Sequence, residues 1–131
     1  MEDFFSEQSG KSPLLRGNVE NGTIEVAGVC LLEDAKVFFK PFVDWIEDMA
    51  VQTPADQISL SFDMHYFNTT TAKILLDIIK LVSSLATTQN KSFEALWIYE
   101  RDDDDMKETG LDYQAMVGNV LRMRAKDPIS E

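Results

Sequence analysis

The most regular stretch of this sequence reads Gln57-Ile58-Ser59-Leu60-Ser61-Phe62-Asp63-Met64, in which polar and apolar residues alternate. Strict alternation is typical of a β-strand that buries one face. The stretch is followed by Tyr66-Phe67-Asn68-Thr69-Thr70-Thr71 and then by a helical pattern that continues to about residue 86. The apolar positions of that pattern form one broad stripe, namely Ile74, Leu75, Ile78, Leu81, Val82 and Leu85. The segment therefore predicts a strand that passes directly into an amphipathic helix.

A β-hairpin is expected upstream of this strand. Residues 14–19 and 23–29 are β-prone and flank Glu20-Asn21-Gly22, and Asn-Gly between two such runs is a strong hairpin signal. Residues 33–50 then carry large apolar side chains at helical spacing, among them Phe38, Phe42 and Trp45, which predicts an amphipathic helix. Pro41 lacks the backbone N–H that a helix interior uses, so this helix is either kinked there or irregular before it.

Downstream, residues 93–99 form the last clear strand pattern, and residues 104–118 a weaker helix. Strands separated by helices run parallel, by the right-handed crossover rule. We therefore predict an α/β fold: a small mixed sheet with an antiparallel N-terminal hairpin, parallel strands and amphipathic helices packed on it. The expected domain covers residues 12–118. A flexible leader over residues 1–11 precedes it, and a basic tail over residues 119–131 follows, to which the sequence assigns no element.

Composition excludes several classes of protein. The chain has 131 residues and a formal net charge of −11, which argues against a nucleic-acid binder because phosphate neutralisation needs clustered Lys and Arg. No apolar run is long enough to cross a membrane, and the start, Met1-Glu2-Asp3, lacks the features of a signal peptide. A single cysteine, Cys30, fits a reducing compartment. The expected location is the cytoplasm, without membrane insertion.

The candidate site is the segment Asn68-Thr69-Thr70-Thr71, at the carboxyl end of a strand and the amino end of a helix. Open α/β sheets place their sites there, and the free N–H groups of a first helical turn tolerate an anion. The ordinary interpretation is a helix cap, which Asn and Thr both provide. Three hydroxyls exceed what one cap needs. A phosphorylated threonine would add about −1.5 to −2 charges and would disrupt an apolar or acidic interface at this corner.

Two other groups of residues could carry chemistry. The acidic run of residues 102–105 could hold Mg²⁺ or Ca²⁺, but it lacks the spaced ligands of a calcium loop, and acids at the start of a helix explain it better. Cys30 and the single histidine, His65, could form a nucleophilic pair only if the fold brought them into contact. We expect each to be structural. The prediction is therefore no catalytic residue, no metal site and no cofactor.

Several segments, in this order and spacing, resemble the SiaC family of bacterial regulatory phosphoproteins from about residue 12 to residue 115. They are Asn21-Gly22-Thr23-Ile24-Glu25-Val26-Ala27-Gly28, Phe38-Phe39-Lys40-Pro41, Asp44-Trp45-Ile46-Glu47, Tyr66-Phe67-Asn68-Thr69-Thr70-Thr71-Ala72-Lys73 and Trp97-Ile98-Tyr99-Glu100. The family tolerates a proline after the paired aromatics, as at Pro41. It often has a proline where this chain has Leu32.

The resemblance implies a non-enzymatic switch with a fold like that of STAS domains. In the family, a serine/threonine kinase phosphorylates a threonine in the Tyr-x-Asn-Thr segment, and a PP2C-type phosphatase removes the phosphate. The unmodified form binds a diguanylate cyclase, which raises cyclic di-GMP and promotes biofilm formation. Carried over, the acceptor is Thr69, with Thr70 and Thr71 as neighbouring alternatives. Our own hypothesis is that the partner docks at the start of this helix, on Asn68, Thr69, Thr70 and Lys73.

Two other functions remain open from the sequence. The first is a STAS-type anti-anti-sigma-factor antagonist, whose partner would be an anti-sigma kinase instead of a cyclase. The second is a small metal-dependent enzyme that uses the acidic run at residues 102–105.

Overall fold

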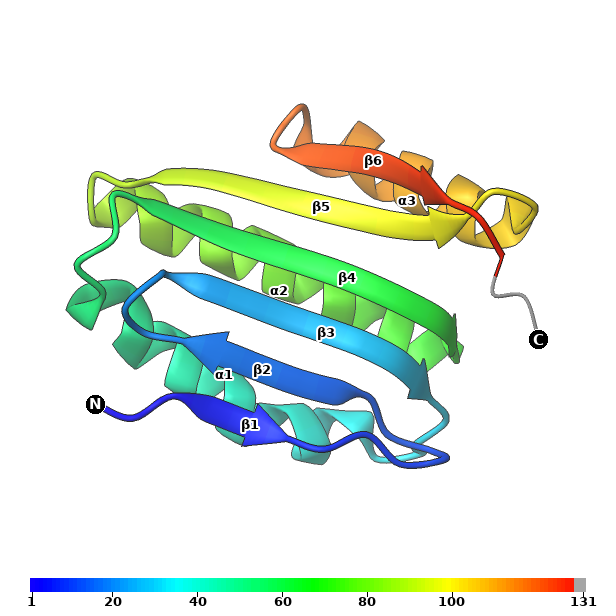
Figure 1. Cartoon of the computed structure of the whole chain (residues 1–131), viewed down its shortest axis with the longest axis horizontal. Helices are drawn as coiled ribbons and strands as arrows, with labels where there is room; N and C mark the ends of the chain where they lie inside the picture. The colour runs from blue at the N-terminus through cyan, green and yellow to red at the C-terminus, as the bar shows by residue number, and fades with distance from the viewer. Residues whose placement is uncertain (129–131) are drawn as a thin grey trace.

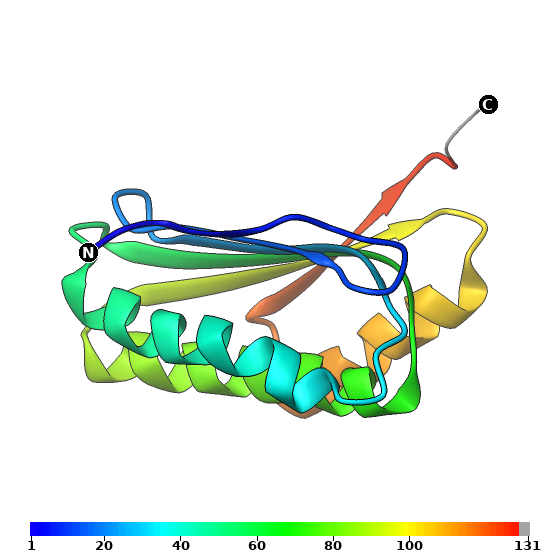
Figure 2. The same ribbon diagram turned by 90° about the horizontal axis from the view of Figure 1, so that it is seen from below.

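The computed structural model describes residues 1–128, which form a six-stranded sheet with three helices on one face (Figures 1 and 2). The elements in chain order are β1 (Phe4–Ser6), β2 (Leu14–Asn18), β3 (Thr23–Cys30), α1 (Ala35–Gln52), β4 (Gln57–Phe67), α2 (Thr69–Thr88), β5 (Ser92–Glu100), α3 (Asp104–Val117) and β6 (Leu121–Lys126). None of these three helices is long and apolar enough to cross a bilayer.

The strands lie side by side in the order in which they occur in the chain. β1, β2 and β3 pair antiparallel, whereas β3, β4, β5 and β6 pair parallel through α1, α2 and α3. The predicted hairpin is confirmed, since β2 and β3 pair from Leu14 with Ala27 to Asn18 with Thr23. Gly22 in its turn has φ +65°, a conformation that favours glycine. The predicted fold class, a mixed sheet with an antiparallel hairpin and parallel strands, is therefore confirmed.

Helix α1 runs through Pro41 without interruption. The proline lies in the second turn with an exposed side chain, so it removes one hydrogen bond to the carbonyl of Val37 while its ring faces solvent. Phe39, Phe42, Ile46 and Met49 are buried on the opposite side. Burial of these four large side chains outweighs the missing bond, since each contributes about 1.5–3 kcal/mol of transfer free energy.

The structure differs from the prediction of a flexible leader over residues 1–11. Residues 4–6 form the edge strand β1, which pairs with β2 so that Phe4 lies opposite Gly17. The Phe4 ring packs 5.0 Å from the Phe42 ring and 6.1 Å from the Trp45 ring. Trp45 also donates a hydrogen bond of 2.8 Å to the carbonyl of Glu2. A Cβ at position 17 would lie 2.2 Å from the Trp45 ring, so Gly17 makes the room that lets these aromatic rings gather.

The predicted boundary at residue 118 is also corrected. Residues 121–126 form β6, parallel to β5, with Leu121 fully buried. Apolar and basic residues alternate along this strand, so the apolar side faces α3 while the basic side chains lie on the opposite face. The last three residues of the predicted tail, 129–131, lie outside the described part of the chain.

The core lies between the sheet and the helices, and Trp97 of β5 is at its centre. This side chain is fully buried, and its ring packs against those of Phe62, Phe67 and Tyr113 at centroid distances of 5.2–6.0 Å. Its indole N–H donates a 3.0 Å hydrogen bond to the carbonyl of Met106 on α3. Trp97 thus connects β5 of the sheet to helix α3.

Candidate functional site

The candidate site lies at the junction of β4 and α2, where Asn68 is the N-cap of the helix. Its side-chain oxygen accepts a hydrogen bond of 3.0 Å from the backbone N–H of Thr71, and its side-chain nitrogen donates one of 3.0 Å to the carbonyl of Leu32. Its backbone N–H donates to the carbonyl of Cys30. Asn68 therefore fixes the start of α2 against the connection between β3 and α1. The cap interpretation of this residue is confirmed.

The three threonines of the segment occupy different environments. Thr71 is 0% exposed, and its hydroxyl lies 2.8 Å from the side-chain oxygen of Asn68 and 3.0 Å from Sγ of the buried Cys30. Thr69 and Thr70 are exposed in the first turn of α2. Thr69 and Thr70 are therefore accessible to solvent in the folded chain, whereas the hydroxyl of Thr71 is enclosed.

The electrostatics of this corner suit an anion. The first turn of α2, residues 69–72, contains no acidic side chain, and its free backbone N–H groups give the helix end a positive partial charge. Lys73, the remaining predicted contact residue, is exposed and pairs with Asp77 one turn further along, at 3.1 Å. None of the hydrogen bonds made by the Asn68 side chain involves the hydroxyl of Thr69 or Thr70, so a phosphate on either hydroxyl would leave the cap intact.

A residue of α3 holds this first turn in place. The hydroxyl of Tyr113 donates a hydrogen bond to the carbonyl of Ala72, and the Tyr113 ring packs on Trp97. Burial raises the pKa of the Tyr113 phenol above its ordinary value, and the carboxylate of Asp77 raises it further. The phenol consequently remains protonated, and remains a donor, throughout the neutral pH range.

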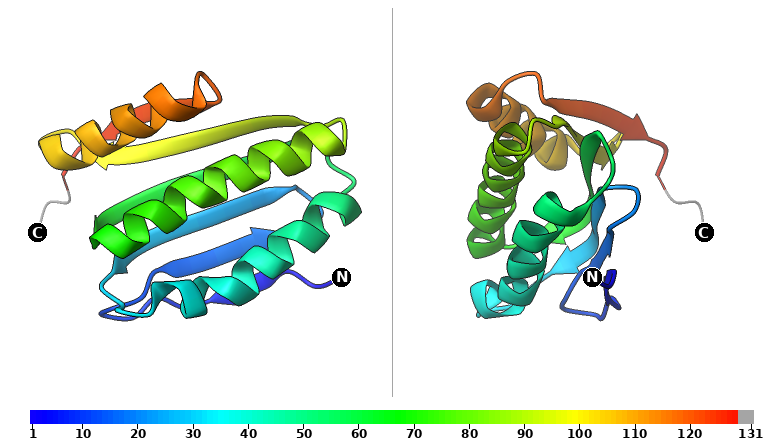
Figure 3. Two further views of the ribbon diagram at one scale, coloured as in Figure 1. Left: turned by 180° about the vertical axis from the view of Figure 1, so that it is seen from behind. Right: turned by 90° about the vertical axis from the view of Figure 1, so that its left-hand side faces the viewer.

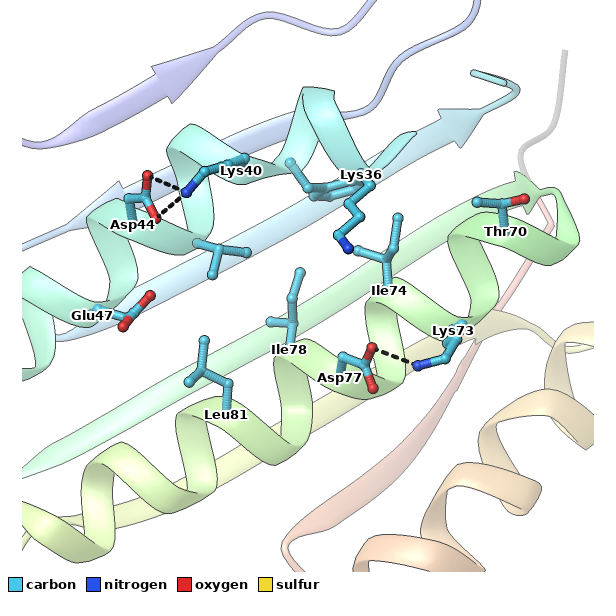
Figure 4. Close-up of a pocket in the computed structure, with 12 residues that line it drawn as sticks. Lys36, Lys40, Asp44, Glu47, Thr70, Lys73, Ile74, Asp77, Ile78 and Leu81 are labelled. Carbon is cyan, nitrogen blue, oxygen red and sulfur yellow. Dashed lines mark hydrogen bonds and ion pairs between the residues drawn. The ribbon is translucent and has the colours of Figure 1, made fainter. Parts of the chain in front are cut away.

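Beside this corner, α1 and α2 form a groove with a volume of about 590 Å³ (Figure 4). We call it the α1–α2 groove; its apolar lining is Phe39, Val43, Ile74, Ile78 and Leu81, and its charged rim is Lys36, Lys40, Asp44, Glu47, Lys73 and Asp77. Thr70 lines the end of the groove at the start of α2 (Figure 4). An apolar groove with a charged rim can bind a protein segment of matching pattern. A phosphate on Thr70 would therefore lie at this end of the groove.

The groove is not among the sites predicted from the sequence, although the sequence of each helix contains a signal for it. Phe39 and Val43 are spaced four apart on α1, as are Ile74 and Ile78 on α2. Phe39 and Ile78 are buried, and the half-buried Val43 and Ile74 widen the apolar stripe of each helix beyond the part that faces the sheet. Each of these patterns describes one helix alone, whereas the groove depends on how α1 and α2 lie relative to each other.

The other candidate residues have structural surroundings. Asp103 is the N-cap of α3, where its side chain accepts a 3.0 Å hydrogen bond from the backbone N–H of Met106, and Asp104 and Asp105 lie in the first helical turn. The prediction of helix-start acids is confirmed. Cys30 is buried under α2, while His65 is exposed and lies 3.7 Å from Glu100. The structure does not bring Cys30 and His65 together. Within residues 1–128, no three His, Cys, Asp or Glu side chains gather as metal ligands would.

Removal of the Asn68 side chain should destabilise the fold. We expect Asn68→Ala to lower the free energy of unfolding by about 2–3 kcal/mol. The substitution removes the helix cap, the hydrogen bond to the carbonyl of Leu32 and the hydrogen bond with the hydroxyl of Thr71. Urea unfolding followed by circular dichroism measures this loss. Asn119→Ala, at an exposed turn position, is the matched control and should change the free energy by less than about 0.5 kcal/mol. Equal effects of the two variants would contradict the role given to Asn68.

The chain is similar to known proteins over almost its whole length. Residues 6–126 match the model of the SiaC family regulatory phosphoprotein. An uncharacterized protein of Pseudomonas aeruginosa strain UCBPP-PA14 is 22% identical over 129 residues, which is 97% of this chain and 99% of that protein.

Solved structures share the fold. SiaC of Pseudomonas aeruginosa superposes with a TM-score of 0.81 at 20% identity. The superposition covers 96% of this chain and 100% of the SiaC chain. A second solved structure, from the same organism, is that of the diguanylate cyclase SiaD in complex with its activator SiaC. One chain of that structure matches with a TM-score of 0.83 at 19% identity, over 95% of this chain and 100% of the matched chain.

Proposed function

Because the chain belongs to the SiaC family of regulatory phosphoproteins, we propose that it is a non-enzymatic activator whose binding to a diguanylate cyclase is switched off by phosphorylation of Thr69. The unmodified chain binds the cyclase through the β4–α2 corner and the α1–α2 groove, in the cytoplasm. A serine/threonine kinase adds the phosphate and a PP2C-type phosphatase removes it. Bound cyclase then raises cyclic di-GMP and promotes biofilm formation.

One observation carries this proposal: Thr70 lines the end of an apolar groove and Thr69 is its exposed neighbour at the start of α2, whereas Thr71 beside them is enclosed. A phosphate on Thr69 meets the positive end of α2, so the fold tolerates it. A partner that desolvates this corner would meet a group of about −1.5 to −2 charges. Mispaired charge in a protein interface costs several kcal/mol, which is enough to abolish micromolar binding.

The cyclase is favoured over an anti-sigma kinase as the partner. The family match and the existence of a solved complex between SiaC and the cyclase SiaD support it. The two alternatives differ in the protein that co-purifies with the unmodified chain, and mass spectrometry of that protein separates them.

Substitution of Thr69 tests the switch. We expect Thr69→Ala to bind the cyclase and to accept no phosphate from the kinase, and Thr69→Glu to weaken cyclase binding by ~10-fold or more, because a carboxylate imitates part of the phosphate charge. Pulldown with purified cyclase measures binding, and intact-mass spectrometry after co-expression with the kinase counts the phosphates.

A matched control is available on the same helix. Thr87 is exposed at the opposite end of α2, where its hydroxyl bonds the carbonyl of Ser83. Thr87→Glu adds the same charge far from the corner and should bind the cyclase as the parent does. Wild-type binding by Thr69→Glu would defeat the switch. A phosphate that still lands on Thr69→Ala would move the acceptor to Thr70, its exposed neighbour.

A further inference from the structure

The face of the sheet opposite the helices is covered by no helix or strand in residues 1–128 (Figures 2 and 3). The strand order explains this arrangement: each parallel strand follows the previous one in the same direction across the sheet, so successive right-handed crossovers place α1, α2 and α3 on one side. Parallel strands in proteins are normally covered on both faces. We call the uncovered surface the bare face; its four parallel strands make it a candidate interface.

The strand register gives the order of side chains across the middle of the bare face. Ile98 of β5 lies between Asp63 of β4 and Arg124 of β6. In the next row, Leu96 of β5 lies between a serine of β4 and Arg122 of β6. Leu96 and Ile98 are partly exposed. The centre of the bare face is therefore a short apolar column, with an acidic residue on one side and basic residues on the other.

The bare face carries no net charge, although the chain as a whole carries −11. Its bases and acids are equal in number, namely Arg16, Arg122, Arg124 and Lys126 against Glu25, Asp63, Glu94 and Glu100. Three ion pairs join most of them, Arg16 with Glu25, Arg122 with Glu94 and Lys126 with Asp63. The acidic surplus lies on the rest of the surface. Two copies can therefore approach each other at this face without the repulsion that the other surfaces would cause.

We propose that two copies of this chain associate through their bare faces about a twofold axis parallel to β5. The row Asp63, Ile98, Arg124 is complementary to itself under that symmetry: Ile98 meets its own copy, and Arg124 of each chain lies opposite Asp63 of the other. Arg124 has no ion-pair partner of its own among residues 1–128. Sheets stack about 10 Å apart, a gap that an isoleucine pair fills and an arginine side chain spans.

This dimer is independent of the proposed switch. Helices α1 and α2 lie on the other side of the sheet (Figure 3). The α1–α2 groove is lined by these two helices and Thr69 is the first residue of α2, so both remain accessible when the bare faces pack together. Success or failure of the phosphorylation experiments therefore says nothing about the dimer.

Complementary charge reversal tests the twofold geometry directly. In an isologous interface each residue of a pair is contributed once by each chain. Arg124→Glu alone would place Glu opposite Asp63, and Asp63→Lys alone would place Lys opposite Arg124, so each variant should dimerise at least ~10-fold more weakly than the parent. An equimolar mixture of the two restores opposite charges at both positions between the chains, and should form a heterodimer at least ~10-fold tighter than the homodimer of either variant.

Sedimentation velocity of the full chain in ~0.15 M salt, where the long-range repulsion is screened, measures the monomer–dimer equilibrium. Lys107→Glu, an exposed position on α3, is the matched control and should dimerise as the parent does. A parent that is still monomeric at ~1 mM overturns the proposal, because even a dimer with a millimolar Kd is abundant there. A dimer that neither reversal weakens, or a mixture that does not recover, overturns it as well.

Discussion

Val43→Glu should lower the affinity of the chain for its cyclase partner by ~30-fold or more. Val43 is a half-buried residue of the apolar lining of the α1–α2 groove. A partner that occupies the groove would enclose the new carboxylate against the apolar lining, and a mispaired charge in an interface costs about 2–5 kcal/mol. Each 1.4 kcal/mol is about a tenfold change in affinity. Titration calorimetry with the purified cyclase measures the loss.

The same change at a second valine of α1 provides the control. Val51 is 62% exposed and does not line the groove, so Val51→Glu adds the identical group where the proposal places no partner. It should bind the cyclase within about twofold of the parent. Circular dichroism and urea unfolding establish that both variants remain folded. If Val43→Glu binds as Val51→Glu does, the cyclase docks elsewhere on the molecule, and Thr69 must then act on another surface.

The strand β4 and the helix α2 could be predicted because their periods are long and regular. The same periodicity predicts that Thr71 is buried. This residue precedes Leu75 by four positions and Ile78 by seven, so it lies on the buried stripe of α2. Thr69 and Thr70 lie off that stripe. Helical spacing alone could thus have separated the enclosed hydroxyl from the two accessible ones.

The strands at the two edges could not be predicted in the same way. β1 has three residues, too few for a period, and its anchor is Trp45, which is far away in the sequence. β6 alternates correctly, but its six residues include three bases, which resemble a solvated tail when no partner strand is known. Edge strands commonly carry such charges because they discourage pairing with other chains. Both strands depend on contacts that only the assembled fold supplies.

Trp97→Ala should destabilise the chain more than any substitution at the site, by about 3–5 kcal/mol, the usual result of removing a buried Trp. The side chain is fully buried, and three aromatic rings pack on it. A typical domain is stable by about 5–15 kcal/mol, so much of the variant would unfold at moderate temperature. Urea unfolding followed by far-ultraviolet circular dichroism measures the loss without relying on the missing fluorophore.

Trp97→Phe separates the packing of the ring from its hydrogen bond. Phenylalanine keeps an aromatic ring in the core but gives up the N–H that bonds the carbonyl of Met106, so we expect a smaller loss, about 1–3 kcal/mol. Because Tyr113 packs on Trp97 and bonds the carbonyl of Ala72, the smaller ring should also loosen the first turn of α2. Hydrogen exchange at the amide of Leu76, the position that bonds the Ala72 carbonyl in a regular helix, should accelerate relative to the amides at the far end of α2. Exchange that is unchanged at Leu76 would mean that α3 does not support the corner at which Thr69 lies.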